Sequence, residues 1–191
     1  MADIRRIGFL ADTHSSKADG SDLPQQALDA FAGVDLIVHL GDIGRKGILD
    51  RLGAVAPVLV PSGDGKGYVP AGGAEAAPVK VIEAGSIKVG IVFNVTNPDK
   101  KLSVNEMGVV DFPEVPLDGL LKRRFGGPVE VVVFGGTHRQ TEQQHEGVLF
   151  INPGSPTLPS DRQGDDDIGS VTVLDVSSGS ARVESLRLKR A

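Results

Sequence analysis

Residues 7–14 read IGFLADTH: a run of apolar and small residues followed at once by an acid and an imidazole. The same order recurs in LIVHLGD at 36–42 and in VEVVVFGGTH at 129–138. Each apolar run is too short for a buried helix and has the length of a buried strand. The carboxyl ends of parallel strands form the ligand-binding crevice of an α/β sheet. The side chains expected to meet there are Asp12, His14, Asp42 and His138.

The composition fits this interpretation. With 191 residues, 40% of them hydrophobic and only 4% aromatic, the chain predicts a single domain over 1–191 with an aliphatic core. The absence of cysteine excludes disulfides and thiolate zinc sites. A formal charge of -5 and a pI near 5.3 argue against general nucleic-acid binding, which requires a cationic surface. A phosphate substrate remains compatible, because a bound divalent cation would reverse the local potential.

The sequence also bears on location. Residues 1–6 lead into the first strand without the apolar segment of a secretion signal, and no apolar run approaches the roughly 20 residues of a membrane span. We therefore expect a cytoplasmic protein without membrane contact. The sequence leaves homo-oligomerisation open.

The first half alternates predicted strands and helices. Parallel strands joined by helical crossovers are the expected outcome of such a βαβαβ unit. The predicted strands are 7–11, 36–40 and 58–60. One predicted helix begins near residue 23, and the other spans about 45–52.

The second half mixes hairpins with one helix. We expect an irregular cap over 94–116 and a solvated loop at Asp165-Asp166-Asp167. The other predicted elements are a hairpin over 78–93, a helix at 117–125, strands at 129–134 and 145–151, and an antiparallel pair at 170–176 and 181–188.

Two aspartates and two histidines would make a mixed oxygen and nitrogen site. Such a set suits Mn, Fe, Zn or Co better than the all-oxygen shell that Ca prefers. The alternative is that Asp12 and Asp42 are turn residues and that His14 and His138 are incidental.

Five motifs in order resemble the calcineurin-like metallophosphoesterases, in particular the small bacterial and archaeal phosphodiesterases. These motifs are Asp12-Thr13-His14, His39-Leu40-Gly41-Asp42, Gly63-Asp64, Gly135-Gly136-Thr137-His138 and Asn152-Pro153-Gly154-Ser155-Pro156. The resemblance implies a two-sheet α/β sandwich, with mixed sheets flanked by helices. It also implies a pair of metals that activates water against a phosphate ester.

The resemblance assigns the first metal to Asp12, His14, Asp42 and His138, with Asp42 and His14 as the catalytic residues. The second site departs from the family. Asp64 stands where the family has Asn, while Phe93 and Gly136 stand where it has His. What remains is a weak, oxygen-only shell of Asp42, Asp64 and the Asn94 amide, so we expect one tightly bound ion.

Four further residues are candidates for supporting roles. Arg45 and Lys66 could bind the substrate phosphate, although Arg45 could equally be solvated and Lys66 could belong to a structural turn. We expect His39 to support a ligand or pack in the core, and Asn152 to brace the site from a turn.

Two functions follow from this set. The first is a phosphodiesterase or phosphatase of low activity, acting on a small phosphate ester with Mn, or alternatively with Fe, Zn, Co, Ni or Mg. The second is a catalytically inactive protein of the same fold that binds metal or another protein, as the retromer subunit of this fold does. Phe93 and Gly136 favour the second function, and the complete first ligand set favours the first.

Overall fold

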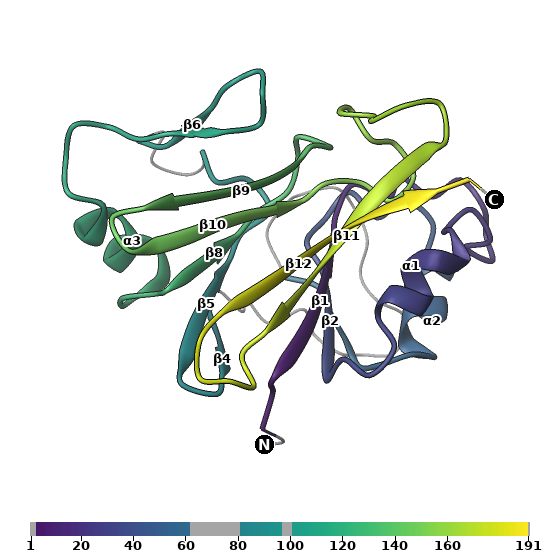
Figure 1. Cartoon of the computed structure of the whole chain (residues 1–191), viewed down its shortest axis with the longest axis horizontal. Coiled ribbons are helices and arrows are strands. Elements are labelled where there is room, and N and C mark those ends of the chain that lie inside the picture. The colour runs from purple at the N-terminus through teal and green to yellow at the C-terminus, as the bar shows by residue number, and fades with distance from the viewer. Residues whose placement is uncertain (1–2, 62–80, 97–100, 191) are drawn as a thin grey trace.

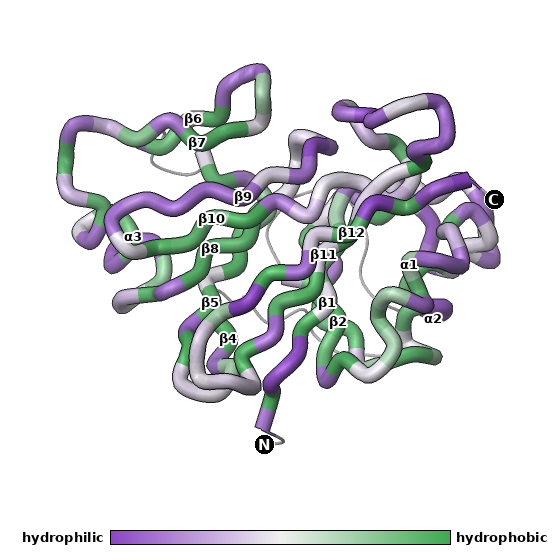
Figure 2. Tube along the Cα trace, viewed as in Figure 1, coloured by the Kyte–Doolittle hydropathy of each residue, from purple (hydrophilic) through white to green (hydrophobic). Residues whose placement is uncertain are grey.

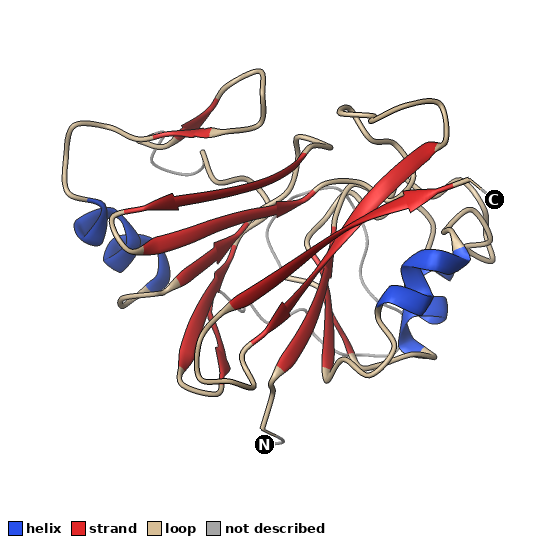
Figure 3. Cartoon of the chain, viewed as in Figure 1, coloured by secondary structure: helices blue, strands red, loops and turns tan. Residues whose placement is uncertain are grey.

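Two five-stranded sheets face each other in the computed structural model, which describes residues 3–61, 81–96 and 101–190 (Figures 1 and 3). The strand order is β12-β11-β1-β2-β3 in the first sheet and β4-β5-β8-β10-β9 in the second. Both sheets contain parallel and antiparallel pairs. The predicted two-sheet α/β sandwich with mixed sheets is confirmed.

The first sheet contains the βαβαβ unit. Its central strand β1 runs parallel to β2, and β2 runs parallel to β3, as predicted. Strand β11 pairs with β1 in the antiparallel sense and carries β12 at the sheet edge. The elements are β1 (Arg6–Leu10), α1 (Gln25–Ala30), β2 (Leu36–His39), α2 (Gly47–Gly53), β3 (Val58–Leu59), β11 (Asp167–Asp175) and β12 (Arg182–Lys189).

The second sheet is built around β8, which runs parallel to both β5 and β10. Helix α3 (Leu117–Phe125) has the predicted bounds and ends at Gly126, whose φ of 80° is a left-handed helix terminus. The strands are β4 (Val81–Ala84), β5 (Ile87–Ile91), β8 (Val131–Val133), β9 (Gln140–His145) and β10 (Val148–Pro153).

Three apolar layers hold the sandwich together. The central layer lies between the sheets and includes Phe9 and Val38 from the first and Val133 from the second. Helices α1 and α2 cover the outer face of the first sheet, and α3 covers the outer face of the second (Figure 1). The central strands are green in Figure 2, which marks them as hydrophobic. Most of the buried hydrophobic side chains are aliphatic, as the composition predicts. Among the described residues, no helix is long and apolar enough to cross a membrane.

The segment 94–116 differs from its prediction as an irregular cap, because it contains the small pair β6 (Ser103–Val104) and β7 (Val110–Asp111). The side chain of Gln143 on β9 explains why this segment forms a regular strand pair. Its Oε1 accepts a hydrogen bond from Val110 N at 2.9 Å, and its Nε2 donates to Val110 O at 3.0 Å. Backbone pairing is therefore completed by a side chain more than 30 residues away.

Strand β9 was not predicted, because only 145–151 was expected to form a strand at this point. Residues 140–145 read QTEQQH and carry no apolar alternation, and β9 is mostly purple in Figure 2. Pairing with β10 decides its structure, with every residue from Gln140 to His145 in register. The hairpin turns at Glu146 and Gly147, both with positive φ.

Two further predictions were wrong in detail. Helix α2 begins at Gly47 rather than 45, because the segment before it pairs with Ser15: Ser15 N donates to Ile43 O and Arg45 N donates to Ser15 O, both at 2.9 Å. Asp167 does not belong to a solvated loop: it is 1% exposed and starts β11. Asp64 and Lys66 lie outside the described residues, as do residues 78–80 of the predicted hairpin.

The contact of β1 with α1 gives a test of the packing. A Cβ at Gly8 would lie 2.5 Å from the buried Phe31 ring, whereas a Cβ at Gly53 meets nothing within 4 Å. We expect Gly8→Ala to lower the free energy of unfolding by about 1–3 kcal/mol through overpacking. The matched Gly53→Ala should leave it unchanged or raise it by up to about 1 kcal/mol. Urea titrations of both variants measure the difference, and equal stabilities would contradict this packing.

Candidate metal centre

The loops that follow β1 and β2 run side by side. Asp12 N donates to Gly41 O at 2.9 Å, and His14 N donates to Asp42 O at 2.8 Å. These bonds exist because β1 and β2 are parallel neighbours, so both chains leave the sheet at the same edge. The acid and imidazole of the first motif are thereby brought beside the acid of the second.

Three side chains converge at this edge. Ligand atoms of Asp12, His14 and His138 all lie within 4.8 Å of one another. His14 Nε2 is 3.3 Å from His138 Nε2, and the two rings are stacked with centroids 5.1 Å apart. Asp42 lies outside this trio but borders it, with its Oδ2 3.4 Å from His14 Nε2.

The backbone at these residues is strained. Asp12, His14, Asp42 and His138 all have positive φ, at 54°, 40°, 53° and 58°. Within the described ranges, Glu146 is the one other non-glycine residue in this state. A side chain in the left-handed region costs roughly 1–2 kcal/mol per residue, and such outliers concentrate at functional sites. The strain therefore falls on the four residues whose side chains were expected to share one ion.

The Asp12 carboxylate is buried and incompletely bonded. Its Oδ2 accepts a hydrogen bond from Gly136 N at 2.9 Å, while its Oδ1 has no partner. Burial raises the Asp12 pKa to about 6, although the charge of His138 and the Gly136 N–H act to lower it. A cation between Asp12 and the two imidazoles would supply the missing partner, so the donor set fits a divalent metal.

The tautomer of His138 agrees with such a role. His138 Nδ1 lies 2.8 Å from Leu158 O. Because a carbonyl only accepts, Nδ1 is the donor of this bond, and the Nε2 atom of the ring faces His14. Metal-binding histidines are typically held by such a bond to a carbonyl.

His39 lies behind the trio. Thr13 Oγ1 donates to Ile43 O at 2.8 Å, so the 2.8 Å contact with His39 requires His39 Nε2 to donate. Complete burial lowers the His39 pKa to about 3, which keeps the ring neutral. The ring thus contacts the residue between Asp12 and His14 rather than the centre itself.

A segment that we call the bracing loop, residues 154–161, joins the ligand-bearing parts of the site. Ser155 Oγ donates to Asp12 O at 2.8 Å, and Thr157 Oγ1 donates to Thr13 O at 2.7 Å. Ser160 N donates to His138 O at 2.9 Å. The sequence marked the start of this loop as a turn, but nothing in it indicated the contacts of Thr157 and Ser160.

Asn152 lies at the end of β10, directly before this loop. Its Nδ2 donates to Thr137 Oγ1, and its Oδ1 accepts from Gly154 N, both at 3.0 Å. Gly154 has a φ of 72°, and a Cβ there would lie 2.2 Å from Ser170 Oγ. This turn therefore depends on glycine, and Asn152 connects it to the residue before His138.

Phe93 occupies the region where a second ion was considered. A Cβ at Gly136 would lie 3.7 Å from Phe93 Cζ, and one at Gly135 would lie 3.2 Å from Phe93 Cδ2. The aromatic ring thus covers this glycine pair. Asn94 Oδ1 accepts a hydrogen bond from Thr96 N at 2.9 Å, and Asp64, the other candidate oxygen ligand, is not among the described residues.

Only one of the two candidate phosphate-binding residues, Arg45, lies in the described part of the chain. Arg45 is exposed, and its backbone N donates to Ser15 O at 2.9 Å in the segment before α2. Lys66 falls in the part of the chain that is not described.

The buried charge of Asp12 gives a pH-dependent test on chelator-treated protein. Because the folded pKa lies above the ordinary 3.8, the native state loses stability as pH rises through about 6. We expect Asp12→Asn to raise the free energy of unfolding near neutral pH by up to about 3 kcal/mol, and the gain to vanish near pH 4. Guanidinium titrations across pH measure it, with the exposed Asp118→Asn as control. Added Mn should stabilise only the wild type, and a less stable metal-free Asp12→Asn would contradict this assignment.

Comparison with known proteins places these features in a family. Residues 6–179 match the calcineurin-like phosphoesterase superfamily domain. A protein of Methanocaldococcus jannaschii named "Probable metallophosphoesterase" is 32% identical over 155 residues, covering 80% of this chain and 69% of that protein. One of Methanothermobacter thermautotrophicus with the same description is 30% identical over 153 residues, covering 80% and 78%.

Solved structures share the fold at lower identity. Wild-type Vps29 of Entamoeba histolytica complexed with zinc has a TM-score of 0.60 and 20% identity, covering 95% of this chain and 98% of that one. A structure described as a novel archaeal phosphodiesterase has a TM-score of 0.56 and 19% identity, covering 95% and 99%. The domain match and the two archaeal relatives show that the chain belongs to the calcineurin-like metallophosphoesterase superfamily.

Proposed function

We propose that this protein is a metal-dependent phosphoesterase that hydrolyses a small phosphate ester. The observation that carries the proposal is the buried, unpartnered Oδ1 of Asp12 beside two converging imidazole nitrogens. Family membership supports a phosphoesterase-type function, and the archaeal phosphodiesterase of the same fold supports a phosphodiester as substrate.

The proposed ligands differ in how deeply their side chains are buried, and we propose different roles for the buried and the exposed ones. Asp12 is fully buried and anchors the site, whereas His14 is 39% exposed and Asp42 is 15% exposed at the open side. A divalent cation held here supplies Lewis acidity, which lowers the pKa of water and offsets the charge of a phosphate ester. We assign the catalytic positions to His14 and Asp42, because water and substrate reach them from solvent. Asp12 and His138 complete the ligand set.

We propose Mn as the native ion, with Fe, Zn, Co, Ni and Mg as alternatives. The mixture of carboxylate oxygen and imidazole nitrogen suits the transition metals better than Mg. The Phe93 ring beside Gly135 and Gly136 contributes no ligand atom, so we propose one tightly bound ion. A second ion at Asp42 and Asp64 would be held weakly, by oxygen ligands alone.

The same aromatic ring favours a second candidate function. A two-metal site stabilises both the attacking and the leaving oxygen of a displacement, and a one-metal site gives up part of that stabilisation. A catalytically inactive protein that binds metal or another protein is therefore the alternative. Turnover distinguishes the two candidates, because metal binding is compatible with both.

Other expectations remain predictions. We expect a single domain in the cytoplasm that acts on a small molecule, without general nucleic-acid binding, and we leave homo-oligomerisation open. Arg45 and Lys66 are our candidates for contacting the substrate phosphate, and Asp64 for the weak second ion.

The number of ions is directly measurable. We expect protein purified without chelator, then dialysed extensively, to retain one equivalent of transition metal per chain in elemental analysis. His138→Ala and Asp12→Ala should retain almost none, whereas His145→Ala, which changes a histidine outside the centre, should retain as much as wild type. Two equivalents after dialysis would contradict the single tight site.

Turnover separates the two candidate functions. We expect an aryl phosphodiester to be hydrolysed on addition of Mn, and the rate to fall at least about a hundredfold in Asp42→Ala, equivalent to about 2.7 kcal/mol of barrier. Arg182→Ala, on an exposed part of β12, is the control. Stoichiometric Mn binding without hydrolysis of either an aryl phosphodiester or an aryl phosphomonoester would favour the binding protein.

A further inference from the structure

His138 depends on the bracing loop for both its ring and its backbone. The ring donates from Nδ1 to Leu158 O at 2.8 Å, and the backbone carbonyl accepts from Ser160 N at 2.9 Å. The orientation of His138 Nε2 toward Asp12 therefore follows the position of residues 158–160. Any group that fixes this part of the loop also fixes a metal ligand.

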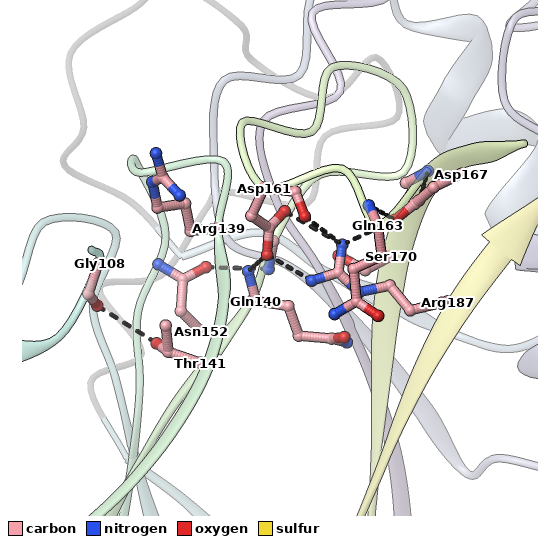
Figure 4. Close-up of polar contacts among 12 residues, drawn as sticks. Gly108, Arg139, Gln140, Thr141, Asn152, Asp161, Gln163, Asp167, Ser170 and Arg187 are labelled. Carbon is pink, nitrogen blue, oxygen red and sulfur yellow. Dashed lines mark hydrogen bonds and ion pairs between the residues drawn. The ribbon is translucent and has the colours of Figure 1, made fainter. Parts of the chain in front are cut away.

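Asp161 ends the loop and is bonded on two sides. Its Oδ2 accepts a hydrogen bond from Gln140 N at 3.0 Å, two residues after His138. Arg187 on β12 donates from Nη1 to Asp161 Oδ1 at 3.1 Å and from Nη2 to Oδ2 (Figure 4). One carboxylate thus connects the start of β9 in the second sheet to the edge strand of the first.

Arg187 lies between two carboxylates. Its Nη1 is 3.3 Å from Asp167 Oδ2, and Asp167 also accepts from Gln163 N at 2.8 Å and Gly169 N at 3.0 Å (Figure 4). Burial alone would lower the Arg187 pKa, but the hydrogen bonds and charges of Asp161 and Asp167 raise it above its ordinary value. The guanidinium therefore stays charged and offers a two-pronged contact of fixed geometry.

The two halves of the bracing loop have different anchors. The first half is held from β11, where Ser170 N donates to Ser155 O at 2.9 Å and Ser170 Oγ donates to Pro153 O at 2.8 Å. In the second half, Leu158 N donates to Ser155 Oγ at 2.8 Å, and the end that includes Ser160 is held through Asp161. Loss of Arg187 would therefore leave the Asp12 side of the centre in place and loosen the Ser160–Asp161 end, whose Ser160 amide bonds the His138 carbonyl.

We propose that Arg187 is a positioning residue for the metal centre, which acts through Asp161 and residues 158–160 to hold His138 against Asp12. This role rests on the proposed function, because it assumes that the centre binds an ion. Arg187 contacts neither the ion nor the substrate. Removal of a group that orients a ligand typically costs 10–100-fold in metal affinity, and we expect a loss in this range.

The test compares Mn affinity in four variants by calorimetric titration. Arg187→Met removes the guanidinium and keeps much of the side-chain volume. Arg187→Lys keeps the charge and should recover part of the affinity. Asp161→Asn breaks the ion pair with Arg187 and leaves an oxygen that can still accept from Gln140 N. It replaces Arg187→Met as the test variant if Arg187→Met does not fold. Leu188→Ala, on the next residue of β12, empties a buried apolar site on the α1 side and serves as the destabilised control.

We expect Arg187→Met and Asp161→Asn to weaken Mn binding at least about tenfold, and Leu188→Ala to stay within about twofold of wild type. Amide hydrogen exchange gives a second readout that does not depend on metal. The Ser160 and Gln140 amides should exchange faster in Arg187→Met, while those of β1 should not.

The outcomes separate this role from the function on which it rests. Unchanged Mn affinity in both Arg187→Met and Asp161→Asn would overturn the positioning role and leave the proposed function intact. Equal losses in Leu188→Ala would also overturn it, because the effect would then be one of general stability. Wild-type protein that binds no divalent ion would overturn the proposed function, and the positioning role with it.

Discussion

The buried carboxylate of Asp12 is the constraint around which the rest of the site is arranged. One oxygen is bonded to Gly136 N and the other has no partner, in a carboxylate that lies within 4.8 Å of two imidazoles. An uncompensated charge in this position destabilises the metal-free fold, as its raised pKa indicates. The neighbouring backbone adds to that cost, because the four residues expected to share an ion all have positive φ. A bound cation would offset both costs. The stability of the fold and the proposed metal binding therefore depend on the same carboxylate, that of Asp12.

The sandwich supplies the ligands from both sheets. Asp12, His14 and Asp42 come from the edge of the first sheet, and His138 comes from the second, after β8. The apolar layer between the sheets fixes their separation, but it does not set the orientation of an imidazole. The bracing loop orients the His138 imidazole through a hydrogen bond to its ring. The same short segment also bonds the backbone carbonyls of Asp12 and Thr13.

Phe93 bears most directly on the choice between a hydrolase and a binding protein. Its ring lies against Gly135 and Gly136, beside the trio, and offers no ligand to an ion. Because an apolar ring provides no ligand for a second ion, less of the negative charge on a bound phosphate would be neutralised by metal. It leaves the strained trio and its buried Asp12 carboxylate intact, however. A protein that needed only the scaffold would have no physical reason to retain the cost of that strain and burial.

Local pattern was sufficient for the strands that carry the ligands and for the order of the motifs. Short apolar runs that end in Asp12, Asp42 or His138 identify buried strands, because burial is encoded within a few residues, and strand direction places Asp12 and Asp42 at one sheet edge. The expectation that His138 leaves the same sheet was wrong, because β8 belongs to the second sheet and only the packing of the two sheets brings His138 to this edge. Helix α3 was equally predictable from its apolar spacing and its glycine terminus. The tertiary structure alone decided the rest. Strand β9 is polar and exists because β10 pairs with it, and the buried Asp167 has its charge offset by an ion pair with Arg187. The tautomer of His138 is likewise set by a carbonyl 20 residues away. These features depend on partners distant in sequence, which only the folded chain brings together.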